Sequence, residues 1–281
     1  MILVGNMKKN RILFTGGNGF IGKQIVPLLE EDGWEIIRPR SYQVRLEVTE
    51  EVDSLFENQH FDAIIHSAIV GGRRDVDDSS DVFLTNMLMF ENVFKHIDKT
   101  NLFINFDSGA SLGRPSISEE PDGNDLGKII PKDPYGFSKY CIAKRVLDNP
   151  KGLNLRIFGC FGQYESRDRF FAKNIRNYID KKDIIIVKDR KMDFIYANDL
   201  YKIIKKCLDK EIIQKDINCV YQKKYFLSEL AEIINTLDKY TVNITKQGSY
   251  KESSYCGFAS QLDIEFDGIE KGIKECYEYY K

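Results

Sequence analysis

The chain has 281 residues, of which 42% are hydrophobic and 30% are charged, and its formal net charge is −2. This composition is ordinary for a soluble protein of one or two domains, and the small net charge gives no reason to expect a nucleic acid partner. No apolar run approaches the roughly 18 residues of a membrane-spanning helix, so we expect no membrane partner either.

Strands and helices alternate over the first part of the chain, because short apolar runs are separated by longer amphipathic ones. The expected strands cover residues 11–15, 34–40, 45–49, 62–66, 101–109 and 153–159. One helix is expected between the first two strands, and further helices cover residues 50–59, 81–97 and 134–148. Residues 113–133 are polar and rich in Gly and Pro, which predicts a long surface loop.

After about residue 165 the alternation loosens. Helices are expected over residues 168–181, 198–209, 227–237 and 267–280, and short strands over 184–187 and 193–196. The pattern predicts an α/β fold with a doubly wound parallel sheet of the Rossmann type in residues 1–165. Residues 166–281 are expected to form a smaller, partly interleaved substrate-binding region over the carboxyl edge of the sheet.

The segment GGNGFIG, residues 16–22, follows the first strand and opens the first helix. Glycines at the first, fourth and last positions let the backbone turn tightly and approach a pyrophosphate, which then faces the helix N-terminus. This placement predicts a dinucleotide site rather than a turn kept only for packing. We expect the cofactor contacts to come from Gly16, Asn18, Gly19, Phe20, Ile21 and Gly22.

The second strand ends in IIRPRS, with Arg38 and Arg40 and no acidic residue nearby. NAD-binding versions of this turn usually place an acid here to hold the ribose 2′-hydroxyl. Guanidinium groups suit a 2′-phosphate instead, because they form paired, charge-assisted hydrogen bonds with it. We therefore expect Arg38 and Arg40 to bind NADP(H), with NAD as the less favoured cofactor.

Residues 135–139, YGFSK, place a tyrosine and a lysine four residues apart. Asp133 and Pro134 mark the N-terminus of an expected helix, so Tyr135 and Lys139 leave the same face, one turn apart. An unperturbed phenol titrates near ~10, and a neighbouring ammonium group favours its ionised form. The two side chains are either an exposed surface pair or a proton-transfer pair.

Five segments, in order, resemble the extended short-chain dehydrogenase/reductase family, whose members mostly act on nucleotide-activated sugars. They are TGGNGFIG (15–22), SGAS (108–111), YGFSK (135–139), LRIFGCFG (155–162) and DFIYANDL (193–200). The resemblance implies that Tyr135 protonates a substrate carbonyl while the cofactor delivers hydride. Lys139 would lower the pKa of that tyrosine and hold the nicotinamide ribose. Ser108 would bond the reacting oxygen, with Ser111 as the alternative.

The resemblance also implies further contacts at the site. For the cofactor, besides the tyrosine and the lysine, these are Ser67, Ala68, Asn86 and Phe158. For the nucleotide sugar they are Ser108, Ala110, Cys160, Phe161, Arg169 and Arg190. Met192 stands where the family usually has an arginine that contacts the nucleotide. We therefore expect Arg169 or Arg190 to take the pyrophosphate.

Departures from the family's motifs favour one reaction over its rivals. Dehydratases follow the catalytic hydroxyl with Asp-Glu, whereas Gly109 and Ala110 stand here. Epimerising reductases carry a cysteine at the position of Ala110 and a later histidine, but no histidine follows His96. We expect NADPH-dependent reduction of the 4-keto group of a nucleotide-linked 6-deoxy sugar. An NAD-retaining C4-epimerase and a non-catalytic NADP(H)-binding sensor stay open as alternatives.

The six cysteines and three histidines are scattered without zinc-ligand spacing, so we expect no metal site. His66 ends an apolar run and is expected to be structural. Free cysteines fit a reducing compartment, and we expect the cytoplasm. Enzymes of the resembled family often form homodimers through a four-helix bundle, which residues 82–97 and 134–148 could supply, so a homodimer is expected.

Overall fold

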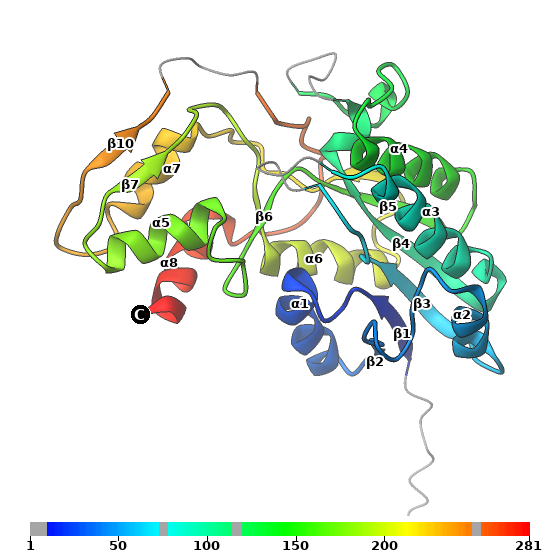
Figure 1. The fold of residues 1–281 in the computed structure, drawn as a ribbon. Coiled ribbons are helices and arrows are strands. Elements are labelled where there is room, and N and C mark those ends of the chain that lie inside the picture. The colour runs from blue at the N-terminus through cyan, green and yellow to red at the C-terminus, as the bar shows by residue number, and fades with distance from the viewer. Residues whose placement is uncertain (1–9, 73–77, 114–119, 249–253) are drawn as a thin grey trace, which may run out of the picture.

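The computed structural model describes residues 10–72, 78–113, 120–248 and 254–281 (Figure 1). A six-stranded parallel sheet with helices on both faces forms the larger part. A smaller lobe of helices and short strands lies beside it, on the left of Figure 1. The α/β class and the doubly wound parallel sheet expected from the sequence are confirmed.

The large sheet has the strand order β2-β1-β3-β4-β5-β9. The chain leaves β1 for β2 at one edge and then returns to β3 on the other side of β1. In sheets of this type, ligands bind outside the carboxyl ends of the strands at this reversal. The strands are β1 (Arg11–Thr15), β2 (Glu35–Ile37), β3 (Phe61–His66), β4 (Thr100–Ser108), β5 (Gly152–Ile157) and β9 (Asp216–Asn218).

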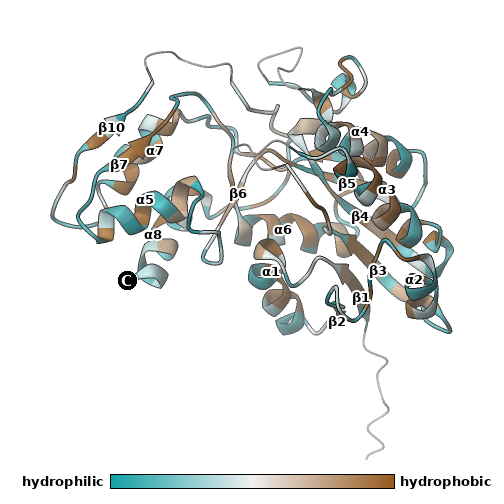
Figure 2. Ribbon diagram, viewed as in Figure 1, coloured by the Kyte–Doolittle hydropathy of each residue, from teal (hydrophilic) through white to brown (hydrophobic). Residues whose placement is uncertain are grey.

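Helices α1 (Phe20–Glu31) and α6 (Ala197–Leu208) cover one face of the sheet. Successive strand residues point to opposite faces, so Ile12 and Phe14 pack on this side, and both are fully buried. Figure 2 shows hydrophobic residues, in brown, along the central strands and on α6.

Helices α2 (Thr49–Phe56), α3 (Asp81–Phe94) and α4 (Pro134–Leu147) cover the opposite face. Leu13 and Ile64 point to this side and are also fully buried. The central strands β1 and β3 are therefore apolar on both faces, which explains why they read as continuous hydrophobic runs rather than as alternating ones.

The smaller lobe has its own apolar core, formed by helices and two short parallel strand pairs. Its helices are α5 (Phe170–Ile179), α7 (Leu227–Ile234) and α8 (Gly268–Tyr280), and the strands are β6 (Cys160–Phe161) with β8 (Ile195–Tyr196) and β7 (Ile184–Ile186) with β10 (Ile244–Lys246). Short 3-10 helices elsewhere are η1 (Ile97–Lys99), η2 (Gly109–Leu112) and η3 (Gly123–Asp125). In the described part of the chain no helix is both long and apolar enough to cross a membrane.

The strand expected over residues 45–49 is wrong. The chain turns here, and the Val48 N–H donates to the Arg45 carbonyl. The Leu46 carbonyl accepts a hydrogen bond of 3.0 Å from the side-chain amide of Asn92, on α3. Because the Asn92 side chain satisfies the hydrogen-bonding need of this carbonyl, no neighbouring strand is required. Leu46 can therefore pack in the core beneath α2 and α3.

Residues after 165 contribute to both parts of the molecule. β9 extends the large sheet, with Ile217 paired to Leu155, although its three residues give no strand signal in the sequence. α6 packs beside α1, whereas α5, α7 and α8 belong to the lobe. The assignment of residues 166–281 to substrate binding stays a prediction.

Candidate active site

The glycine turn lies at the reversal of strand order and contacts the end of β3. Gly16 has φ +72°, and an added Cβ would lie 2.8 Å from Ala68 N and 2.9 Å from Ser67 C. At Gly22 an added Cβ would lie 2.2 Å from the Gly17 carbonyl oxygen. Side chains are thus excluded at two points, which lets the backbone form the close cradle that a pyrophosphate needs at a helix N-terminus. The residues present fit a dinucleotide.

An open hollow of about 440 Å³ lies beside this turn, lined by Asn18, Lys23, Arg38 and Arg40. The Asn18 side-chain amide donates to the Arg38 carbonyl at 3.0 Å, which ties the turn to the end of β2. Three cations and no acid line the hollow, so it suits a phosphate group. Sequence reasoning missed Lys23, whose signal was a basic residue one turn into α1.

Helix α4 presents the tyrosine and the lysine as the sequence predicts. Asp133 caps it by accepting from the Gly136 N–H at 2.7 Å, with Pro134 at the first position. Lys139 is 3% exposed, and its Nζ donates to the Phe106 carbonyl at 2.5 Å. Burial lowers the pKa of Lys139 to about 8, although the charge of Asp107 opposes the fall. An ammonium group is thus held inside the protein.

The hydroxyl predicted to bond the reacting oxygen sits at the carboxyl end of β4. Ser108 caps η2, where its Oγ accepts from the Ala110 N–H at 3.2 Å. Ser111 is fully buried, and its Oγ lies 2.8 Å from both Asp107 Oδ2 and the Ser108 carbonyl oxygen, which share its one hydroxyl proton. Because Ser111 already bonds these partners, the geometry favours Ser108. The same strand end also anchors Lys139, through Phe106.

A buried ion cluster fixes the strand ends beneath this site. Arg156 is 0% exposed and donates from Nε to Asp107 at 2.8 Å and from its terminal nitrogens to Asp216 and Asn218. Its three partners belong to β4 and β9, while Arg156 itself belongs to β5. Removing one partner of such a pair leaves a buried charge uncompensated, so the cluster holds these three strand ends together.

Two residues expected to contact the cofactor are almost fully buried. Asn86 is 1% exposed, and its amide bonds the backbone of Val70 and the hydroxyl of Ser138. Phe158 is 6% exposed, and an added Cβ on Gly109 would lie 2.5 Å from its ring. Both lie around the ends of β3 to β5, and a contact between either of them and the cofactor stays a prediction.

Comparisons with known proteins settle the family. The model described as "NAD dependent epimerase/dehydratase family" matches residues 12–219, which is most of the chain. This chain belongs to that family. The family resemblance read from the motifs is therefore confirmed.

Individual relatives match over nearly their full length. GDP-L-fucose synthase of Azorhizobium caulinodans is 24% identical, over 97% of this chain and 97% of that protein. A solved GDP-6-OMe-4-keto-L-xylo-heptose reductase from C. jejuni has a TM-score of 0.79 at 15% identity, covering 97% of each chain. A GDP-L-fucose synthetase from Naegleria fowleri bound to NADP has the same TM-score of 0.79 at 15% identity. The match covers 96% of this chain and 92% of that one. At these identities the structural likeness shows the fold alone.

Three of the residues expected to contact the substrate are buried, and their contact with it stays a prediction. Ala110 and Phe161 are 0% exposed, and Cys160 is 4% exposed. The Phe161 ring stacks on Phe171 at 4.1 Å between centroids, within the core of the lobe. Burial raises the pKa of the Cys160 thiol far above its usual range, which disfavours the reactive thiolate form.

The two arginines expected to bind the pyrophosphate lie on the lobe and are not fully buried. Arg169 precedes α5, and its Nε lies 3.2 Å from Glu165 Oε1. Burial raises the pKa of Glu165 to about 7, against the opposing charge of Arg169. The Arg190 carbonyl accepts from the Leu227 N–H. Met192 packs in the lobe core and is 8% exposed.

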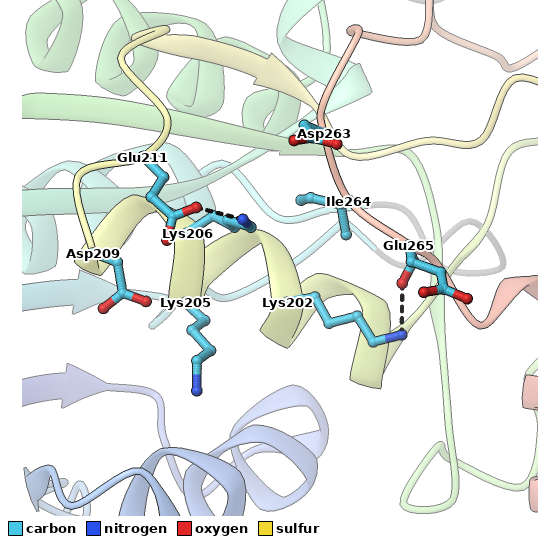
Figure 3. Close-up of a pocket in the computed structure, with 8 residues that line it drawn as sticks. All are labelled: Lys202, Lys205, Lys206, Asp209, Glu211, Asp263, Ile264 and Glu265. Carbon is cyan, nitrogen blue, oxygen red and sulfur yellow. Dashed lines mark hydrogen bonds and ion pairs between the residues drawn. The ribbon is translucent and has the colours of Figure 1, made fainter.

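A second hollow, of about 410 Å³, lies between α6 and residues 263–265 (Figure 3). Its lysines are already paired with carboxylates: Lys206 with Glu211, Lys202 with Asp199 and Asp267, and Lys205 with Asp32. Because its positive charges are neutralised, this hollow offers no phosphate site. Its lining residues are Lys202, Lys205, Lys206, Asp209, Glu211, Asp263, Ile264 and Glu265.

Within the described residues, no group of His, Cys, Asp and Glu side chains could hold a metal ion. His66 is 2% exposed, and its Nδ1 lies 2.9 Å from the Thr15 hydroxyl. Burial, and secondarily the charge of Lys139, lower the pKa of His66 to about 3, so the imidazole is neutral. This contact joins β1 to β3, which is a structural role.

Proposed function

We propose that this chain reduces the 4-keto group of a nucleotide-linked 6-deoxy sugar with NADPH. One observation carries the proposal: α4 presents Tyr135 one turn before a buried Lys139 that bonds β4, and Ser108 ends that same strand. This set lies at the carboxyl edge of the sheet, where the glycine turn also lies. Relatives named as a GDP-L-fucose synthase and a 4-keto-heptose reductase support this substrate class.

The side chains divide the work of the reduction. NADPH, when bound, supplies the hydride that reaches C4 of the sugar. Tyr135 gives its hydroxyl proton to the ketone oxygen, so that the C=O bond becomes a CH–OH group. The ammonium group of Lys139 stabilises the phenolate left behind. Ser108 donates a hydrogen bond to the oxygen on which negative charge develops.

The cofactor choice rests on the hollow that contains Arg38 and Arg40, and a structural neighbour bound to NADP supports it. Replacing both arginines by alanine should raise the KM for NADPH by about 10²- to 10⁴-fold, because each charge-assisted hydrogen bond contributes about 1.5–3 kcal/mol. Lys23→Ala should have a smaller effect in the same direction. The KM for NADH should change little, because NADH lacks the 2′-phosphate.

Steady-state kinetics with both cofactors make that comparison. Arg145→Ala is the matched control, because Arg145 is an exposed arginine that pairs with Glu91 and does not line this hollow. An equal rise of KM for NADPH and NADH would contradict the assignment of this hollow to the 2′-phosphate.

A direct assay separates the proposed reductase from its two rivals. Purified protein supplied with GDP- or dTDP-linked 4-keto-6-deoxy sugars should consume one NADPH for each sugar reduced. A C4-epimerase would instead retain NAD through purification and interconvert C4 epimers with no added cofactor. A sensor would bind NADPH and turn over no sugar. Mass spectrometry of the released nucleotide and the nicotinamide absorbance distinguish these results.

The proposal extends to a homodimer formed through α3 and α4. Leu84, Leu88 and Phe137 are 59%, 40% and 36% exposed on these helices, and Phe137 stacks on Phe83. A second copy of this face would bury such an apolar patch. Sedimentation should then give twice the 32.6 kDa chain mass, and a single-chain mass would refute the dimer. The six free cysteines fit a cytoplasmic location.

A further inference from the structure

The turn of residues 70–72, between β3 and α3, packs against the ring of Tyr135. Gly71 and Gly72 have φ values of +78° and +77°, a region that residues with side chains rarely adopt. A Cβ added to Gly72 would lie 2.6 Å from Tyr135 Cε2 and 2.7 Å from Cζ. Because Cζ bears the hydroxyl, the backbone of Gly72 contacts the reactive end of the ring.

Side chains hold this turn against α4. Asn86 accepts from the Val70 N–H at 2.9 Å and donates to the Val70 carbonyl at 3.1 Å. The same amide donates to the Ser138 hydroxyl at 3.1 Å, and that hydroxyl donates to the Tyr135 carbonyl at 2.7 Å. One buried amide thus bonds both the turn and the helix that carries the tyrosine.

A second contact holds the turn from the other end. The Gly72 N–H donates to the Asp78 carboxylate, at 2.9 and 3.2 Å from its two oxygens. Since both ends of the turn are bonded, it cannot easily retreat from the ring.

We propose that Gly72 is a positioning residue for the reduction. Its backbone carries no side chain, is held in place by Asn86 and Asp78, and packs against the Tyr135 ring, so it fixes the position of the Tyr135 hydroxyl. This inference rests on the proposed function. A side chain here would push the ring away from Gly72 and move the hydroxyl relative to the ketone. Displacements of about 1 Å at a reacting group can cost about 10²-fold in rate.

Gly72→Ala should therefore lower kcat by about 10²-fold with little change in NADPH affinity. Gly33→Ala is the matched control, because Gly33 has φ +91° and no atom within 4 Å of an added Cβ. The Gly33→Ala variant has the same type of backbone strain, at the α1–β2 turn, and its kcat should equal that of the unmodified protein. If Gly72→Ala does not fold, Asp78→Ala replaces it, with an expected fall in kcat of about 10-fold.

A double-mutant cycle separates positioning from general damage. In a Tyr135→Phe background, Gly72→Ala should cause no further loss, because the hydroxyl that it displaces is already absent. A full kcat in Gly72→Ala, or the same fractional loss in both backgrounds, would overturn the inference while the proposed function stands.

Fluorine NMR of protein labelled with fluorotyrosine tests the inference without any substrate. The Tyr135 resonance, identified by its loss in Tyr135→Phe, should shift in Gly72→Ala and stay in place in Gly33→Ala. An unshifted resonance would overturn the inference. The NMR shift tests the inference even if the unmodified protein reduces no keto sugar. That lack of activity would refute the proposed function and leave the inference standing.

Discussion

Replacing Tyr135 by phenylalanine is expected to lower kcat by about 10²- to 10⁴-fold, with folding and NADPH affinity unchanged. The substitution removes one oxygen and leaves the ring that packs on Gly72. Among the described residues that surround Ser108, Gly109 and Ala110 carry no acid and the Cys160 thiol is buried, so none of them replaces the phenol. Proton transfer to the ketone oxygen would then depend on water.

The control for this substitution is Tyr140→Phe, which removes the same hydroxyl one turn further along α4. Tyr140 stacks on Phe137, on the outer side of the helix, and should be dispensable for turnover. Single-turnover rates and NADPH titrations of both variants test the pair. Equal kcat in Tyr135→Phe and the unmodified protein would remove Tyr135 from the chemistry.

Replacing Lys139 by methionine is expected to abolish reduction and yet to stabilise the fold at pH 7 by about 2 kcal/mol. The fall of its pKa from 10.5 to about 8 on burial means that charged Lys139 costs roughly 3 kcal/mol, at about 1.4 kcal/mol per tenfold change in proton affinity. The variant also loses the hydrogen bond to the Phe106 carbonyl, which destabilises it by about 1 kcal/mol and leaves a net gain of about 2 kcal/mol. The protein thus keeps a destabilising charge where the proposed reaction needs one.

The sign of the pH dependence follows from the same pKa. The folded state binds the lysine proton more weakly than the unfolded state does, so the cost is fully present below about pH 8. As the pH rises from about 8 towards 10.5, Lys139 becomes neutral in both states and the cost disappears. The stability advantage of Lys139→Met should therefore shrink over this window.

Denaturant unfolding of both proteins at pH 7 and at pH 10 measures this difference, and the paired comparison cancels other titrating groups. Lys139→Ala is a less suitable variant, because it would add a cavity. If Lys139→Met is less stable at pH 7, or if its advantage does not change with pH, Lys139 is not a buried charge.

Local sequence patterns were sufficient for most of the large sheet. Apolar runs bounded by Gly, Pro and charged residues located β1, β3, β4 and β5 to within two residues at each end. The strand expected over residues 45–49 failed because the amide of Asn92, distant in sequence, takes the Leu46 carbonyl. β9 was missed because its three residues become a strand only by pairing with β5.

The site was predictable where spacing along one element fixes it. Tyr135 and Lys139 share a helix face, so four residues of sequence were enough to place them together. Lys23 and Gly72 were missed because their proposed roles depend on contacts between segments that are separate in the sequence. The motif position of Phe161 does not show that its ring stacks inside the lobe, and its contact with the substrate stays a prediction.

Transfer of a labelled hydride tests the central claim most directly. The protein is incubated with a nucleotide-linked 4-keto-6-deoxy sugar and NADPH that carries deuterium at its transferable position. The account predicts one deuterium at C4 of the product sugar for each NADPH consumed, and a transfer rate lower by about 10²- to 10⁴-fold with Tyr135→Phe. A reduced sugar without deuterium, or an epimerised sugar formed while NADPH stays intact, would contradict it.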